Sequence, residues 1–111
     1  MCNQARVPLR EDAIPTLEEL LLFKLNKFTG KDPLDTISLL TVESIDFKYL
    51  KKRIPEFDLS RLIENIDEFE YSQKYLYKRW EKWHFCQLRK SMISILDTNL
   101  SKLKNIINDY K

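Results

Sequence analysis

Apolar residues recur at steps of three and four along most of the chain, which is the spacing that aligns side chains on one face of an α-helix. The first such segment follows Thr16, and Glu19 stands three positions later, which is the pattern of a capping box. We predict a helix over about 17–28, closed by Gly30 in the left-handed conformation. Because apolar residues occupy nearly every side of this helix, we expect it to lie in the centre of the core.

Two shorter helices are predicted next along the chain. Asp32 followed by Pro33 is typical of a helix start. The acid caps the first turn, and the proline stands at the first helical position, where the N–H that it lacks would have no partner within the helix. The third helix is predicted to end near Arg53, because Pro55 disfavours helical geometry at the residue before it.

The longest periodic segment follows Asp58, which is predicted to cap it. No proline or glycine occurs in the 56 residues after Pro55. An apolar seam with alternating steps of three and four, typical of coiled-coil packing, comprises Leu59, Leu62, Ile66, Phe69, Gln73, Leu76, Trp80 and Trp83. We therefore predict one long amphipathic helix over about 59–95, which after Trp83, where the apolar row shifts sideways, either kinks or changes what it packs against.

A short terminal helix is expected after residues 97–99, which are all of cap-forming type, because the apolar spacing resumes at Leu100. The chain contains a single glycine, which disfavours the tight turns of β-hairpins. Together these segments predict an all-α protein, a bundle of four to five helices in a single domain over 16–111. An irregular N-terminal arm is expected over 1–15, which holds two prolines and no periodic pattern.

Charge is distributed unevenly along the 111 residues, although the net charge is only +2. Residues 1–72 carry ten Lys/Arg against fourteen Asp/Glu, a balance of −4, and residues 73–111 carry nine against three, a balance of +6. The acidic front and basic rear can contact each other or meet partners of opposite charge. No apolar run approaches the roughly 20 residues that span a bilayer, so we expect an intracellular protein without membrane contact.

The sequence offers little support for catalysis. Its only histidine, His84, lies two residues from Cys86, and on a helix these side chains diverge by about 200°. They therefore form neither a metal-binding pair nor a nucleophile with its base. We expect no enzymatic activity, no catalytic residue, no metal and no cofactor. The two cysteines are too few for a disulfide framework, which favours a reducing compartment.

The segment 69–85 holds seven of the thirteen aromatic residues, and helical spacing divides it into two faces. One face is predicted to be core and comprises Phe69, Leu76, Trp80 and Trp83. The opposite face combines aromatic and basic side chains, and we call it the basic aromatic face. It comprises Tyr71, Lys74, Tyr75, Lys78, Lys82, Phe85 and Arg89. This face is the candidate partner-binding site.

A basic aromatic face can anchor an acidic partner helix, or it can stack nucleobases and neutralise phosphates. We favour the protein partner, because nucleic-acid-binding modules of this size usually carry a far larger positive balance than +2. Salt dependence separates the two, since binding through phosphates falls steeply with salt and an apolar helix interface resists it.

A motif within the seam comprises Tyr75, Leu76, Arg79, Trp80, Lys82 and Trp83, with Glu64 eleven positions before the tyrosine. It resembles the long central helix of the α-helical domain of GINS subunits, the four-subunit accessory of the eukaryotic and archaeal replicative helicase. The segments before and after are similar in layout to that family's opening and closing helices. The resemblance implies a reduced subunit, because the small β-rich second domain of the family has no room in this chain.

We therefore expect a non-enzymatic helical subunit of a multiprotein assembly, held to other protein subunits by helix packing in a hetero-oligomer, with weak or indirect contact to nucleic acid. The GINS resemblance implies a role in DNA replication and a nuclear location. Two alternatives remain: a basic helical module that binds nucleic acid directly, and a helical interaction protein of an unrelated family.

Overall fold

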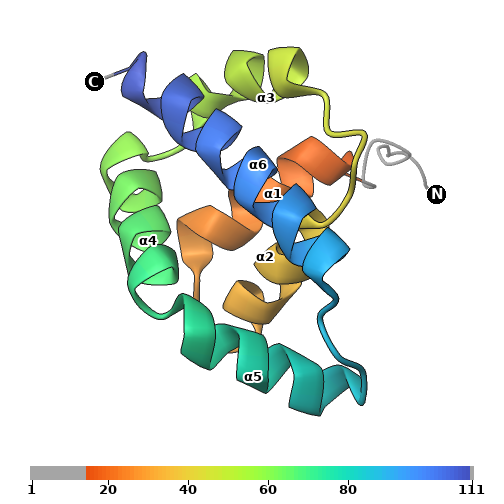
Figure 1. Ribbon diagram of the computed structural model, residues 1–111. Helices are drawn as coiled ribbons and strands as arrows, with labels where there is room; N and C mark the ends of the chain where they lie inside the picture. Colours follow the sequence, from red (N-terminus) through yellow and green to blue (C-terminus); the bar gives the residue numbers. More distant parts are fainter. Residues whose placement is uncertain (1–14, 111) are drawn as a thin grey trace, which may run out of the picture.

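The computed structural model describes residues 15–110, and within that range it contains helices and no strand. The helices are α1 (Leu17–Lys27), α2 (Asp32–Leu40), α3 (Phe47–Arg53), α4 (Leu59–Tyr71), α5 (Gln73–His84) and α6 (Lys90–Asn108), with a 3₁₀ turn at Ile54–Glu56 (Figure 1). The all-α class is confirmed, and the six α-helices exceed the predicted four to five. The arm predicted over 1–15 falls, except for Pro15, outside the described residues.

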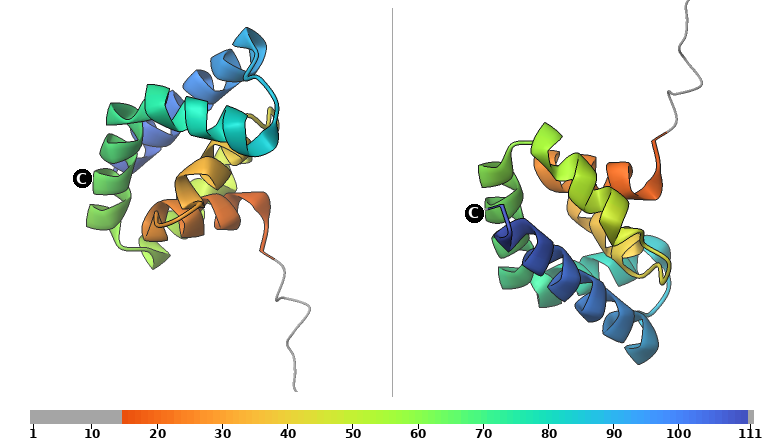
Figure 2. Two further views of the ribbon diagram at one scale, coloured as in Figure 1. Left: turned by 90° about the horizontal axis from the view of Figure 1, so that it is seen from below. Right: turned by 90° about the horizontal axis from the view of Figure 1, so that it is seen from above.

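Helix α1 packs on the core through one side and leaves Phe23 and Lys27 exposed, so the prediction that it lies in the centre of the core is wrong. It packs against α2, α3 and α4. Its leucines Leu21, Leu22 and Leu25 are fully buried, and Phe23 on the remaining side is half exposed. Helices α3 and α5 lie at opposite ends of the bundle, and α6 runs obliquely between them (Figures 1 and 2).

Local capping signals position two of the helix starts as predicted. The Thr16 hydroxyl accepts the Glu19 N–H at 3.1 Å, and the Glu19 carboxylate accepts the Thr16 N–H at 2.9 Å, which completes the capping box of α1. At the start of α4, the Asp58 carboxylate accepts the Arg61 N–H at 3.3 Å. These short-range contacts need only the neighbouring sequence, which is why the pattern predicts them.

The loop between α1 and α2 corrects two of the predictions. The left-handed residue that closes α1 is Phe28, with φ of 51°, and Gly30 adopts φ of 57° later in the loop. Asp32 belongs to α2 rather than capping it, and its carboxylate accepts the Thr29 N–H at 3.0 Å and contacts the Lys24 ammonium at 3.3 Å. These two contacts satisfy the buried carboxylate of Asp32 and tie the end of α1 and the following loop to the start of α2.

The single helix predicted over 59–95 is wrong, because the chain turns twice within it. Helix α4 ends at Tyr71, its C-cap Ser72 donates its hydroxyl to Glu68 at 2.8 Å, and α5 begins at Gln73. The second break begins at Phe85, where φ is 52°, close to the predicted kink or change of packing. The two breaks let α5 pack on α2, and α6 return across α2, α3 and α4, so that their apolar faces cover the same core.

The separate terminal helix predicted after residues 97–99 is also wrong, since these residues lie inside the continuous helix α6. Asn99 is buried, and its side-chain amide donates to the backbone carbonyls of Leu40 at 2.7 Å and Val42 at 2.8 Å. Asparagine is a residue type that favours helix caps, and here its side chain satisfies backbone carbonyls at and just after the C-terminal end of α2.

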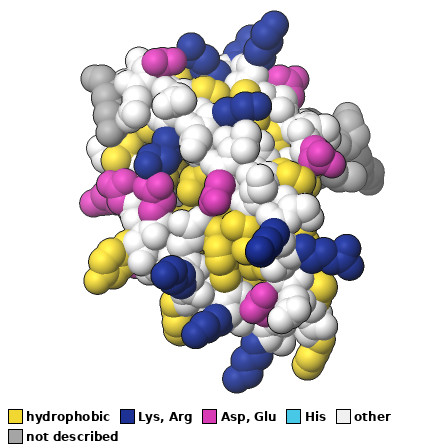
Figure 3. All heavy atoms as spheres, viewed as in Figure 1, with side chains coloured by type: hydrophobic (Ala, Val, Ile, Leu, Met, Phe, Trp, Pro, Cys, Tyr) yellow, Lys and Arg dark blue, Asp and Glu magenta, His cyan; other side chains and the backbone are white. Residues whose placement is uncertain are grey.

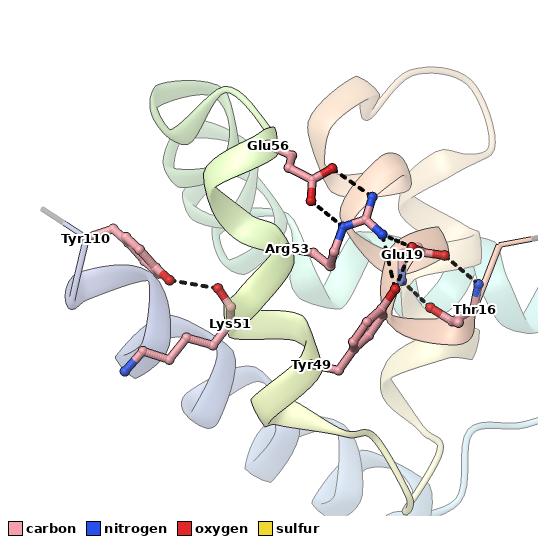
Figure 4. Close-up of polar contacts among 7 residues, drawn as sticks. All are labelled: Thr16, Glu19, Tyr49, Lys51, Arg53, Glu56 and Tyr110. Atoms are coloured by element: carbon pink, nitrogen blue, oxygen red, sulfur yellow. Dashed lines mark hydrogen bonds and ion pairs between the residues drawn. The ribbon is translucent and has the colours of Figure 1, made fainter.

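A polar clamp joins α1 to α3 (Figure 4). The Tyr49 hydroxyl donates to the Glu19 carboxylate at 2.7 Å, and the Arg53 guanidinium donates to the same carboxylate and to Glu56. The backbone N–H of Thr16, the Tyr49 hydroxyl and the Arg53 charge together lower the pKa of Glu19. Because these groups satisfy one another, we assign the clamp to the fold rather than to a binding site.

Candidate functional site

The inner face of α5 is fixed on α2, and this determines which side chains point outward. Leu76 and Trp80 are buried, and the Trp80 indole N–H donates to the Ser38 hydroxyl on α2 at 2.9 Å. His84 stacks on the Trp80 ring, with centroids 4.4 Å apart, and its Nδ1 lies 3.0 Å from the Trp80 carbonyl. With these positions anchored, the opposite side of α5 faces solvent.

All seven residues of the basic aromatic face are exposed, as a free binding surface requires. Four of them lie on α5, namely Lys74, Tyr75, Lys78 and Lys82. Tyr71 ends α4 and is 90% exposed, Phe85 caps the end of α5 and is 96% exposed, and Arg89 stands at the start of α6. The two helix breaks therefore spread the predicted face over three helices, and only Lys82 and Phe85 line one pocket.

The prediction that Trp83 belongs to the core is wrong, because its side chain is 57% exposed. The nine-residue helix α2 is the chief cover of the inner face of α5, and Trp83 lies in the last turn of α5, beyond the buried Trp80. Instead of entering the core, its ring lies beside the Lys31 ammonium, 5.0 Å from the ring centroid, in a cation–π contact.

Trp83 forms one wall of an open pocket between α2 and the end of α5. We call this the Trp83 pocket, and its lining residues are Leu34, Arg79, Lys82, Trp83 and Phe85. Its volume is about 660 Å³, and its walls are mostly apolar. Leu34 is only 2% exposed, so it joins the pocket to the core, and the other four residues extend outward around it. The arrangement offers an apolar recess with a basic rim.

The rim is not neutralised from within the part of the chain that the structure describes. None of Lys31, Arg79 and Lys82 forms an ion pair with a carboxylate of residues 15–110. The one acid on α5, Glu81, accepts the Leu88 N–H at 2.8 Å and so closes the turn into α6. In the space-filling view, basic and hydrophobic side chains alternate over α5 at the bottom, and acidic side chains gather over α4 at the left (Figure 3).

Sequence reasoning missed four residues of this region: Lys31, Leu34, Arg79 and Trp83. The local pattern contains a signal for Arg79, because it stands four positions after Tyr75 and so shares its side of a helix, and in the structure its guanidinium lies 5.8 Å from the Tyr75 ring centroid. No local signal identifies Lys31 and Leu34, because they come from the α1–α2 loop and from α2. Only the packing of α2 against α5 brings Leu34 into the pocket and Lys31 beside its Trp83 wall.

Other chemistry in the described residues is limited. No group of three or more His, Cys, Asp and Glu side chains there is arranged to hold a metal ion. Within residues 15–110, no helix combines the length and apolar character that a membrane crossing requires. Comparison of the chain with known protein families, with curated proteins and with solved structures gives no match.

Proposed function

We propose that this chain is a non-enzymatic subunit of a protein assembly, which binds another protein through the basic aromatic face and the Trp83 pocket. The observation that carries the proposal is the gathering of four exposed aromatic side chains at residues 71–85, among cations of α5 that form no ion pair within the described part of the chain. These are Tyr71, Tyr75, Trp83 and Phe85. Tyrosine, tryptophan and arginine are the residue types that dominate the binding energy of protein interfaces.

Two contacts within the chain favour a protein partner over single-stranded nucleic acid. A nucleobase needs a free aromatic face on which to stack. The Lys31 ammonium already lies beside the ring of Trp83, and the Arg79 guanidinium beside the ring of Tyr75. An apolar side chain of a protein can instead enter the Trp83 pocket without displacing either cation, so the geometry suits protein binding better.

The GINS resemblance makes the replicative-helicase accessory the specific assembly that we propose. Six of the matching residues lie on α5, and Glu64 lies on α4, across the turn at Ser72. In this proposal the chain acts in DNA replication in the nucleus as a reduced subunit. It contributes a binding surface, and the proposal assigns no catalytic residue to it.

The test reverses two charges of the face that lie outside the Trp83 pocket. Lys74→Glu with Lys78→Glu should leave the melting temperature nearly unchanged, because exposed charges contribute at most about 1 kcal/mol each to folding. Proteins captured by the wild-type chain from extract, identified by mass spectrometry, should be lost, since reversed charges repel an acidic partner. The matched control is Lys48→Glu with Lys52→Glu, two exposed lysines of α3 at the other end of the bundle.

Equal loss of partners in both double variants would contradict a binding site on α5. Retention of every partner by the α5 variant would contradict the proposal altogether. The identity of the captured proteins separates its two levels. Capture of helicase-accessory subunits supports the GINS assignment, and specific capture of other proteins supports a subunit of a different assembly and overturns that assignment.

A further inference from the structure

We propose that the Trp83 pocket receives one apolar side chain from an acidic segment of the partner, with carboxylates on both sides of that side chain paired to Lys31, Arg79 and Lys82. This inference rests on the proposed function and names the chemistry of the partner at the same site. The juxtaposition that carries it is an apolar recess, which reaches the buried Leu34 and is lined by Arg79 and Lys82, with a third cation, Lys31, beside its Trp83 wall.

The shape of the pocket suits a single anchoring side chain. Its volume of about 660 Å³ lies within the range of roughly 300–1,000 Å³ of ligand-binding clefts. Aromatic rings of Trp83 and Phe85 and the edge of Leu34 supply apolar surface, and the pocket is open on the solvent side. A side chain presented on a partner helix can therefore enter without any rearrangement of α2 or α5.

The charge around the pocket selects an acidic partner. The nearest acids along the chain are already engaged, because Asp32 and Asp35 pair with Lys24 at 3.3 and 3.0 Å, and Glu81 accepts the Leu88 N–H. On α4, Glu70 pairs with Lys104 at 2.9 Å. The positive rim is thus left for carboxylates from outside the described residues, and such complementarity sets both the rate of association and the choice of partner.

The backbone at Phe85 gives a second, independent indication. Its φ of 52° lies in the left-handed region, which costs a residue other than glycine stability, and its ring is 96% exposed. Phe28 adopts the same conformation, but its ring packs edge-on against Phe69, with centroids 6.5 Å apart. Phe85 has no comparable burial within the described residues, which fits a ring that is covered when the partner binds.

The experiment selects binders from a library of random peptides of about 12 residues, long enough for three turns of helix, against the immobilised full chain. The expected result is enrichment of peptides that combine one leucine, isoleucine or phenylalanine with flanking Asp or Glu. Replacing that apolar residue by alanine should weaken binding at least about tenfold, because burial of a large apolar side chain is lost. Replacing the acids by lysine should abolish binding.

The position of the bound peptide is read from the two tryptophans of the unmodified chain. Acrylamide quenches the exposed Trp83 more than Trp80, which is only 6% exposed, so a bound tryptophan-free peptide should remove most of the quenching. Arg79→Glu and Phe85→Gly should each weaken the selected peptide at least about tenfold, and the Lys48→Glu with Lys52→Glu control should not.

Three outcomes would overturn the inference: no enrichment, enriched peptides without acids, or equal binding to the pocket variants and the wild type. A single-stranded oligonucleotide that binds more tightly than any selected peptide, and is displaced by salt, would identify the site as one for nucleic acid instead. Loss of protein partners in the Lys74→Glu, Lys78→Glu chain, together with a failed peptide selection, would leave the proposed function standing and remove only the pocket.

Discussion

Two phenylalanines in the left-handed conformation show how a single residue can serve the fold or a site. Phe28 closes α1 with a ring that packs on Phe69, and Phe85 closes α5 with a ring in solvent. The sequence could not distinguish them, because both are large aromatics at the ends of periodic segments. The role of each depends on whether its ring is buried, and this is set by the packing of other helices: Phe69 of α4 covers the ring of Phe28, and the ring of Phe85 stays exposed.

At Phe85 we predict that glycine stabilises the fold. Relief of the left-handed backbone contributes about 1–2 kcal/mol, and the greater freedom of glycine in the unfolded chain removes about 0.4–1 kcal/mol, so Phe85→Gly should raise the free energy of unfolding by roughly 0.5–1 kcal/mol. Phe28→Gly should lower it, because the contact with Phe69 is lost. Urea denaturation measures both, and destabilisation by Phe85→Gly would show that its ring has a structural role.

Asn99 is a second residue whose role only the structure reveals. It was expected to help cap a terminal helix, and instead its amide satisfies the carbonyls of Leu40 and Val42. Asn99→Ala should lower the free energy of unfolding by about 1–3 kcal/mol, since buried carbonyls lose their donor. Thr98→Ala, at the exposed neighbour, should change it by less than about 0.5 kcal/mol, and similar losses in both variants would contradict this role.

At the scale of elements, capping residues predicted the starts of α1 and α4 but failed at Asp32 and at residues 97–99, and periodicity missed the break at Ser72. Thr16 and Asp58 act through contacts to residues three positions away, which the sequence displays directly. The apolar seam, by contrast, keeps its step of three and four through the turn at Ser72, where no glycine or proline interrupts it. The break is stabilised by the packing of α5 on α2, which is a tertiary contact that the local sequence does not display.

The clamp between α1 and α3 predicts a pH dependence of stability. Folding lowers the pKa of Glu19, so its contribution is complete above about pH 4.5, where the unfolded carboxylate is also ionised, and is lost as pH falls through the folded pKa. Thermal melts between roughly pH 7 and pH 3 should show a steeper fall for the wild type than for Glu19→Gln. Glu64→Gln, at an exposed glutamate of α4, is the control and should leave the wild-type slope unchanged.

At the scale of the whole molecule, the candidate site combines a helix surface that the sequence displays with a pocket that it does not. The exposed lysines of α5 and the exposed Tyr75 follow from helical spacing alone. The pocket does not, because Leu34 enters it from α2, Lys31 reaches its Trp83 wall from the α1–α2 loop, and Trp83 is exposed rather than buried with the other seam residues. A surface on one helix can be predicted from periodicity, and a recess between two helices needs their packing.

The central claim is that the outer surface of α5 is shaped for a partner rather than for folding, and Phe85→Gly tests it most directly. The melting temperature and the capture of wild-type partner proteins would be measured on one preparation of this variant. Our account predicts that the melting temperature rises and partner capture falls, because the residue costs the isolated fold stability and contributes to the interface. A melting temperature that falls together with capture, or capture that is unchanged, would contradict it.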